Sequence, residues 1–264
     1  MQWHILAQTK WLIWVGLVTL TAGHTMSAWS MQPARIGDHA TSLANTIQFP
    51  DVAGDFTKFV RCEAKILPAG SIDELGCYAD ANVDVQFFRA VHMGAQSATV
   101  LPATVDGENV AVLMLLSVVF RQQGDQRVIA VVPNHGTNAK TLGMSYVAPQ
   151  KYGRANQYYP RSELGLIWVD TTMSAQGKAQ STSYLQTEFS NKETERFAKR
   201  YINDNTFIPG HLEGQPRRMR FIKPIFGYRN GFMWESEKSK CRDSAIYCDE
   251  ISDTTGKPRY VFDD

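Results

Sequence analysis

Alternating hydrophobic and polar positions mark two pairs of strands, and each pair turns at a glycine. In the first pair FVRCEAKILPAG ends at Gly70 and IDELGCYA follows; in the second IWVDTTMSAQG ends at Gly177 and AQSTSYLQ follows. Such alternation, visible from Ile167 to Met173, is typical of a strand with one buried face. Glycine suits a turn that needs a positive φ, so each pair is predicted to form an antiparallel hairpin.

A helical pattern follows each hairpin. Residues 82–96 and 191–203 place apolar side chains three or four positions apart, which predicts one amphipathic helix in each region. Ser190, with Glu193 three residues later, predicts a capping box at the start of the second helix. Beyond the first helix, residues 110–120 are almost wholly apolar and are predicted to form a central strand.

The two patterned regions read as an internal repeat. The shift along the chain that carries Gly70 onto Gly177, called the repeat offset below, superposes them without a gap, and VLPATVDG then aligns with FIPGHLEG. We therefore predict an α+β fold with two tandem β-β-α-β modules, over residues 46–122 and 156–228, each a small antiparallel sheet with one helix packed on a face. Three predicted turn positions coincide under the repeat offset: Gly70 with Gly177, Pro102 with Pro209, and Gly107 with Gly214.

The remaining segments are assigned by composition. Residues 123–155 contain VIAVVP, predicted to be an extra strand, and then a linker rich in Gly, Asn and Gln; residues 229–264 contain a short loop between two cysteines and a polar tail. At the N-terminus, Lys10 precedes an apolar run from Trp11 to Ala22. That run is shorter than the roughly 20 residues that span a bilayer, so residues 1–28 are predicted to be a cleaved signal peptide.

The charge balance of the chain argues against one class of partner. The chain has 27 basic and 26 acidic residues, and removal of residues 1–28 takes away one of the basic residues, Lys10. A neutral chain with interspersed charges lacks the basic field that nucleic-acid binding needs.

The four cysteines form two close pairs, and we predict the disulfides Cys62–Cys77, across the first hairpin, and Cys241–Cys248. Zinc is the alternative for these cysteines, but the close CxxC spacing typical of zinc sites is absent.

The second predicted module, and the later part of the first, resemble a known family. A Tyr159-Pro160 lead-in, a strand ending at Gly177, a helix, and then Phe207, Pro209, Gly214 and Pro216 before a final strand resemble the C-terminal domain of TonB. The first copy repeats the later part of this pattern with Pro102, Ala103 and Gly107.

The resemblance implies a periplasmic module that grips an outer-membrane receptor's peptide by adding a strand to its sheet. The chain departs from the family's transducers in its short apolar run and in lacking a long Pro/Lys-rich spacer.

No arrangement of residues indicates an enzyme or a cofactor. His39, His92, His135 and His211 are scattered, and no H-x-x-x-H, G-x-S-x-G or phosphate-binding glycine loop is present. His135, in VVPNHGTN at a strand exit, is the one candidate for catalysis, against the interpretation as a polar turn. His92 and His211 are interpreted as a helix-surface residue and a polar turn residue.

The combined hypothesis is an exported, periplasmic, non-catalytic binding or scaffold protein without metal or cofactor. Its partner is expected to be an envelope or outer-membrane protein that pairs with a sheet edge; aromatic residues near the second copy are also consistent with a peptide or glycan platform. The alternative is a TonB-like accessory of outer-membrane transport, held in the inner membrane by an uncleaved N-terminal segment.

Overall fold

The computed structural model describes residues 30–79, 83–152, 165–186 and 190–227. These fold mainly into antiparallel sheets with few helices, an architecture compatible with the predicted α+β class. Within these ranges no helix has the length and apolar character needed to cross a bilayer. The predicted signal peptide, the Tyr159-Pro160 lead-in, the Cys241–Cys248 pair and the polar tail lie outside the described residues.

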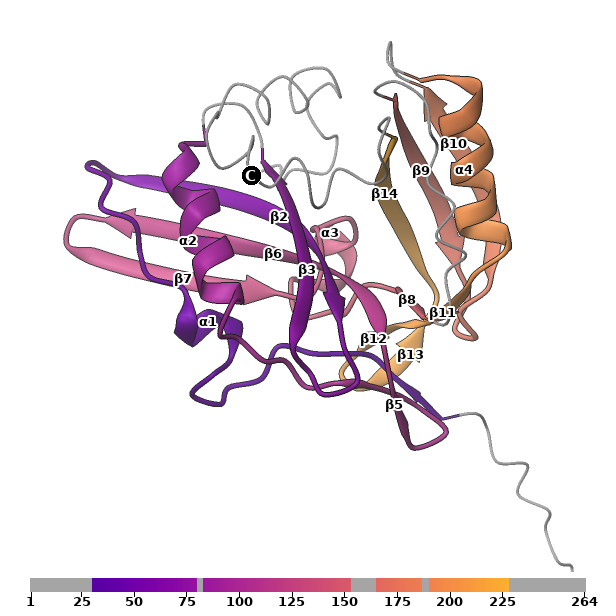
Figure 1. The fold of residues 1–264 in the computed structure, drawn as a ribbon, viewed down its shortest axis with the longest axis horizontal. Helices are drawn as coiled ribbons and strands as arrows, with labels where there is room; N and C mark the ends of the chain where they lie inside the picture. The colour runs from indigo at the N-terminus through magenta and orange to yellow at the C-terminus, as the bar shows by residue number, and fades with distance from the viewer. Residues whose placement is uncertain (1–29, 80–82, 153–164, 187–189, 228–264) are drawn as a thin grey trace, which may run out of the picture.

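The larger sheet has six strands, and all paired strands in it are antiparallel. They are β2 (Phe56–Ile66), β3 (Ile72–Ala79), β6 (Val112–Gln123), β7 (Gln126–Val132), β8 (Gln150–Tyr152) and β11 (Thr206–Ile208). The order is β11-β8-β6-β2-β3, and β7 also pairs with β6, beside β8. β6 has partner strands on both of its edges (Figure 1). This confirms the prediction that the apolar segment 110–120 forms a central strand.

Helix α2 (Val85–Ala95) covers one face of the larger sheet (Figure 1). The Asp84 side chain accepts a hydrogen bond from the amide of Gln86 and so caps the start of the helix. Phe87 and Val91 point into a core that includes Cys62 on β2. Strand alternation sends every second residue of β2 into this core and its neighbours to the opposite face of the sheet.

The smaller sheet contains β9 (Gly165–Met173), β10 (Ala179–Gln186) and β14 (Met219–Gly227) in the order β10-β9-β14. Helix α4 (Lys192–Asn203) covers one face of it (Figure 1). The predicted capping box at Ser190 is wrong by one residue. Asn191 lies at the N-cap, where its side-chain oxygen accepts hydrogen bonds from the amide and the hydroxyl of Thr194.

Short elements complete the described part of the fold. β4 and β5 form a hairpin to which β1 adds a strand, while β12 and β13 form a second hairpin. These elements are β1 (Met31–Gln32), β4 (Ala103–Val105), β5 (Glu108–Val110), β12 (Gly210–Leu212), β13 (Gln215–Arg217), and the single-turn helices α1 (Leu43–Thr46) and α3 (Ala139–Leu142).

Strand pairing recurs at the repeat offset found in the sequence. In both sheets the first strand of a hairpin lies between its hairpin partner and a later strand. Even the capping residues of the two long helices, Asp84 and Asn191, are separated by this same offset. Two sets of cross-strand partners also match under it: Cys62 with Cys77 and Leu116, and Val169 with Tyr184 and Lys223.

The segment expected to be a linker differs from that expectation. Its predicted extra strand is β7, but the following residues do not run over the surface as a simple connection. Tyr146 and Gln150 are fully or almost fully buried, and the Gln150 amide group bonds both the N–H and the C=O of Ala34. Asn and Gln side chains here satisfy buried backbone groups, a role that composition alone does not separate from solvation.

The two sheets are in direct contact. β11 follows α4 in the chain yet pairs with β8 of the larger sheet. Leu115, on the face of β6 that points away from α2, packs into the core beneath α4. An interface between the sheets is therefore built from residues that the sequence pattern assigned to separate modules.

Candidate functional site

The predicted cysteine and turn positions have structural roles. Cys62 and Cys77 are directly opposite on β2 and β3 and form a disulfide across the hairpin. Gly70 and Gly177 have φ of 84° and 73°, and a Cβ at either would lie 2.3 Å and 1.9 Å from the carbonyl oxygens of Val100 and Phe207. Both positions therefore require glycine for its φ and for the close approach of another backbone segment.

The other turn positions form two matching hairpin turns. Gly107 and Gly214 each follow an acidic residue with φ of 52°, Asp106 in one hairpin and Glu213 in the other. Two consecutive residues with positive φ are typical of a tight hairpin turn. None of these positions contributes a reactive group.

His135 lies in the loop after β7 and is buried, which neither interpretation of the sequence predicted. It is 5% exposed; its Nε2 bonds the Cys62 carbonyl at 2.8 Å and its Nδ1 bonds the Tyr78 hydroxyl at 3.0 Å. A carbonyl only accepts, so Nε2 carries the proton and Nδ1 accepts from the phenol. Burial lowers the pKa of His135 to about 3. The ring therefore acts as a neutral connector between the loop after β7 and the larger sheet.

His211 is also buried, and it lies on β12 rather than in the turn where the sequence pattern placed it. Only 2% of it is exposed, since it lies on β12 next to the chain segment of Val147. His39 bonds Thr99 through Nε2, and His92 is on α2 in its last turn. The described histidines are thus far from forming one catalytic group.

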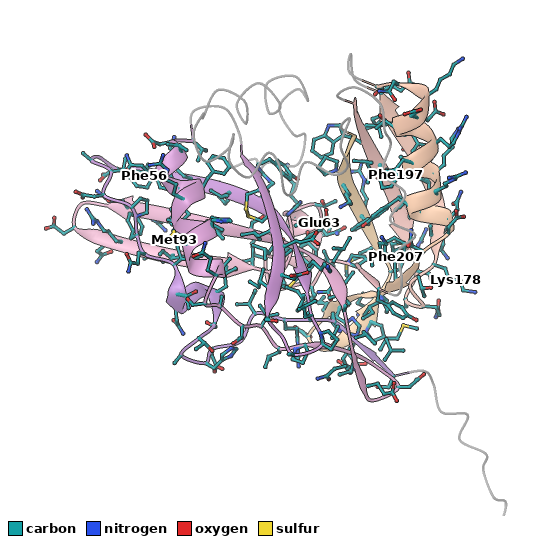
Figure 2. The ribbon with its side chains drawn as sticks, in the orientation of Figure 1. Phe56, Glu63, Met93, Lys178, Phe197 and Phe207 are labelled. Carbon is teal, nitrogen blue, oxygen red and sulfur yellow. A yellow bond between two sulfur atoms is a disulfide. The ribbon has the colours of Figure 1, made fainter. Side chains whose placement is uncertain are left out.

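A buried cluster of charges lies between the two sheets. Glu63, on the face of β2 opposite Cys62, forms an ion pair with Lys223 on β14 (Figure 2 labels Glu63 at this junction). Lys223 is 1% exposed and Glu63 is 7% exposed. The Nζ atoms of Lys223 and Lys151 lie 4.9 Å and 5.0 Å from the ring centre of Tyr201 on α4, within the range of cation–π contacts.

Burial sets the protonation behaviour of this cluster. It lowers the pKa of Lys223, while the Glu63 carboxylate acts in the opposite direction. Burial and the charge of Lys223 lower the pKa of Lys151 to about 8. Burial and the nearby Glu63 carboxylate raise the pKa of Tyr201 well above its usual value. Two amines thus share one carboxylate in a site with little solvent.

Sequence reasoning did not find this cluster. Glu63 alternates with Cys62 and Ala64, so the pattern alone assigns it to a solvent-facing side of β2. Its partner Lys223 is 160 residues away. The one available signal was the repeat offset, because Lys223 matches the apolar Leu116 under it and is therefore out of place on a buried strand face.

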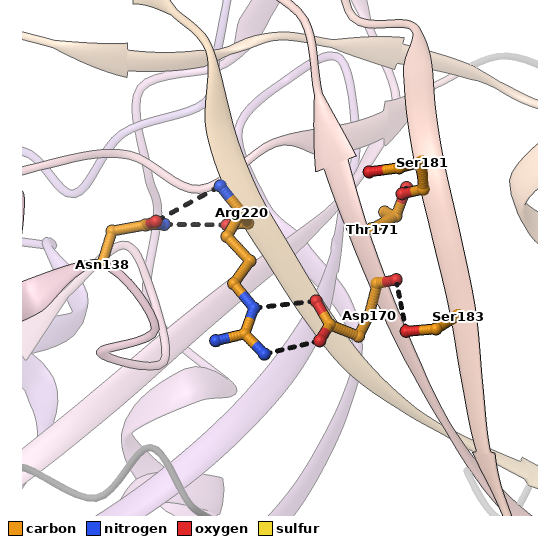
Figure 3. A network of polar contacts seen from close by, with 6 residues as sticks. All are labelled: Asn138, Asp170, Thr171, Ser181, Ser183 and Arg220. Atoms are coloured by element: carbon orange, nitrogen blue, oxygen red, sulfur yellow. Dashed lines mark hydrogen bonds and ion pairs between the residues drawn. The ribbon is translucent and has the colours of Figure 1, made fainter.

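A polar contact closes one edge of the smaller sheet. The side-chain amide of Asn138 donates to the C=O of Arg220 at 2.8 Å and accepts from its N–H at 3.2 Å, as a neighbouring strand would (Figure 3). The Arg220 guanidinium makes two hydrogen bonds to the Asp170 carboxylate, at 2.8 Å and 2.5 Å. Asn138 thus joins the loop before α3 to the outer edge of β14.

The direction of these bonds fixes which backbone groups of β10 point outward. Because Arg220 directs its N–H and C=O away from β9, its partner Thr172 directs its own groups toward β10. Ser181, opposite Thr172, therefore faces β9. The backbone groups of Thr182, Tyr184 and Gln186 consequently point away from the sheet, and within the described ranges β10 pairs with β9 alone.

The edge of β10 is more exposed than its counterpart in the larger sheet. Only Thr182 and Tyr184 of β10 are partly buried, and its other residues are exposed. Along the described side chains of β3, by contrast, only Asp73 is exposed. On the α4 side of β10 the Nζ of Lys199 lies 5.9 Å from the ring centre of Tyr184. An exposed strand edge beside an amphipathic aromatic residue is the main candidate site.

In the part of the chain that the structure describes, no group of three or more His, Cys, Asp or Glu side chains is arranged to hold a metal ion. Comparisons of this chain with models of known protein families, with curated proteins and with solved structures find no match.

Proposed function

We propose that the chain is an exported, non-catalytic binding or scaffold protein that engages a protein partner by strand addition at the edge of β10. The observation that carries this proposal is the row of outward-pointing backbone groups on β10, at Thr182, Tyr184 and Gln186. The other edge of the same sheet, formed by β14, is already contacted by Asn138. An open strand edge recognises an extended peptide through main-chain hydrogen bonds.

The finer assignment is two diverged copies of a module like the C-terminal domain of TonB. The strand registers, helix caps and turn geometries that match under the repeat offset support a duplication. The proposed family rests on the resemblance in sequence. Strand addition, the binding mode of that family, agrees with the exposed edge of β10. The disulfide of Cys62 and Cys77 is compatible with an oxidising compartment such as the periplasm.

The two copies differ in what they offer a partner. β6, the last strand of the first copy, has β7 and β8 on its outer edge, whereas β3 ends its sheet and most of its described side chains are partly buried. In the second copy β14 contacts Asn138 and Glu63 of the larger sheet and its loops. The larger sheet thus supports the second copy, whose β10 is left for binding.

The test is a single substitution that removes one outward N–H. Thr182→Pro deletes the donor without removing a bond to β9, and proline is tolerated on strand edges. Thr182→Ala is the matched control, since it loses the same hydroxyl but keeps the N–H. The full chain is expressed in the periplasm and crosslinked to its partner in envelope extracts. Capture is expected for the wild type and Thr182→Ala, and its loss for Thr182→Pro.

Hydrogen exchange on the purified complex separates strand addition from other binding. Binding is expected to protect the amides of Thr182, Tyr184 and Gln186 and to leave those of Ser181 and Ser183 unchanged, because these already face β9. Equal capture by both variants, no captured partner, or protection without this alternation would each contradict the proposal.

A further inference from the structure

The outer edge of β10 lacks the features that keep exposed strand edges from pairing with other chains. Natural edge strands are protected by charged residues, by proline or by bulges. β10 has the sequence AQSTSYLQ, with no charged residue and no proline, and its register shift lies at its start, between Ala179 and Ser181. β3, which ends the larger sheet, carries Asp73 and Glu74 instead. The stretch of β10 from Thr182 to Gln186 is therefore an unprotected edge.

The outward backbone groups of β10 allow the strand to pair with itself about a two-fold axis. In an antiparallel pair, two residues directly opposite each other can exchange two hydrogen bonds. A register centred on Tyr184 brings all three outward residues into such pairs, with Tyr184 opposite its own copy and Thr182 opposite Gln186. A register centred on Ser183 or Leu185 pairs only two of the three with each other. The edge thus favours one symmetric arrangement.

The side chains on the sheet face away from α4 suit this register. Leu185 is a large apolar side chain that is 43% exposed. The register places it opposite Ser183 of the second copy, and the two Leu185 residues become diagonal neighbours about 7–8 Å apart. Because β10 carries no charge, the symmetric pair brings no like charges of the strand together.

On the other face, helix α4 supplies charges that complement themselves across the axis. The Nζ of Lys199 lies 5.9 Å from the ring centre of Tyr184 and 2.6 Å from Oε1 of Glu195. Both charged groups are therefore beside the position of the axis, and their side chains are 52% and 32% exposed. The two-fold axis places a second such ion pair next to the first in the opposite direction, so that each ammonium group meets a carboxylate of the other copy.

The spacing of the helices leaves room for this contact. α4 packs over β9, the middle strand of the smaller sheet, with Phe197 and Val169 in one core (Figure 1). Pairing of two β10 edges separates the two β9 strands by three strand spacings, which is about 14 Å. Directly packed helices lie only about 8–10 Å apart. The two α4 helices therefore do not clash, and side chains as long as Lys199 and Glu195 reach into the space between them.

We propose that the protein, when no other partner is bound, pairs with a second copy of itself through β10 about a two-fold axis at Tyr184, to form one continuous sheet. This inference rests on the open edge of β10 on which the proposed function also depends, and it names the occupant of that edge in the resting protein. The interface is small, so the dimer is expected to be weak, with a Kd of about 0.1 mM, and to yield to a tighter-binding peptide.

Sedimentation velocity of the purified full chain, from about 10 µM to about 1 mM, tests the pairing. The wild type and Thr182→Ala are expected to shift from monomer to dimer, and Thr182→Pro to stay monomeric, because the symmetric pair uses the Thr182 N–H of each copy. Glu195→Lys and Lys199→Glu are each expected to weaken the dimer by about tenfold, since like charges then meet at the axis. The double variant restores opposite charges and is expected to recover the dimer.

NMR on a mixture of isotope-labelled and unlabelled protein reads the register. An intermolecular contact between the Hα atoms of Ser183 and Leu185 is expected, because these residues form the non-hydrogen-bonded pairs on either side of Tyr184, where the backbones approach most closely. A dimer that shows other intermolecular contacts in place of this one would overturn the proposed register.

The self-pairing and the proposed function can fail separately. A monomer at about 1 mM, a dimer that persists in Thr182→Pro, or a double charge reversal as weak as the single ones would overturn the self-pairing, whatever the envelope extracts yield. A dimer with the expected behaviour supports the self-pairing even where no envelope protein is captured, and in that case only the proposed function fails.

Discussion

Single polar residues in the interior connect segments that are far apart in the sequence. His135 bonds the Cys62 carbonyl and the Tyr78 hydroxyl, each more than fifty positions away. Both ring nitrogens are in use, one as donor and one as acceptor, which leaves no site for an added proton. Protonation of the His135 ring must therefore break one of these two hydrogen bonds.

Acid should destabilise the protein through His135. Its pKa is about 3 when folded and about 6.5 when unfolded, so the unfolded state binds one more proton between these values. The contribution of His135 is complete above pH 6.5 and is lost as the pH falls toward 3, by about 1.4 kcal/mol per pH unit. Urea unfolding at several pH values measures this slope. His135→Gln is expected to flatten it, and equal slopes for the two proteins would refute this role.

Residue roles were predictable from the sequence only where they depend on local geometry. Gly70 and Gly177 end an alternating strand, and a turn there needs a positive φ whatever the rest of the fold does. Glu63 and His211 are polar residues in patterns that usually face solvent. Their burial depends on Lys223 and Val147, which the fold brings next to them from distant positions.

The hairpins of both sheets turn where another segment passes close to the glycine. Val100 directs its carbonyl at Gly70, and its amide donates to the Gly70 carbonyl at 2.9 Å. The hairpin turn and the segment before β4 are thus packed without room for a side chain. Periodicity predicted the hairpins and helices, but it did not predict this contact or the pairing of β1 with β4, because short strands carry little pattern.

Replacement of Gly70 should cost more than its backbone angle alone explains. Gly107 has φ of 85° against 84° for Gly70, yet a Cβ at Gly107 meets nothing within 4 Å. Gly107→Ala is therefore expected to lose about 1–2 kcal/mol of unfolding free energy for the left-handed conformation alone. Gly70→Ala must also move the Val100 carbonyl and should lose clearly more. Denaturant unfolding of both variants compares them, and equal losses would contradict the packing argument.

Across the whole molecule, the two sheets are joined by polar contacts as well as by apolar ones. The Glu63–Lys223 ion pair is buried at this junction, and the Asn138–Arg220 contact is exposed. The overall α+β class follows from the sequence. The mutual placement of the sheets does not, because it depends on pairs such as Glu63 and Lys223 that no local period reports.

Removal of the Glu63 charge should loosen this junction. Glu63→Gln leaves the Lys223 amine buried without its carboxylate, and the expected loss is about 3–5 kcal/mol of unfolding free energy. Glu74→Gln is the matched control, since Glu74 pairs with Lys65 at 3.1 Å but both side chains are partly exposed. That change is expected to cost less than about 1 kcal/mol. Urea unfolding followed by circular dichroism measures both, and similar small losses would rule out an energetic role for the buried pair.

The pairing of β11 with β8 bears on the order in which the protein can be completed. A chain synthesised or threaded from its N-terminus presents β2, β3, β6, β7 and β8 before β11 exists. Until then β8 keeps an unpaired edge, which is a template for unwanted pairing with other chains. Closing that edge requires a contact across more than fifty residues, a separation that slows folding. The first half of the chain is therefore exposed to wrong strand pairing at β8 until the second half supplies β11.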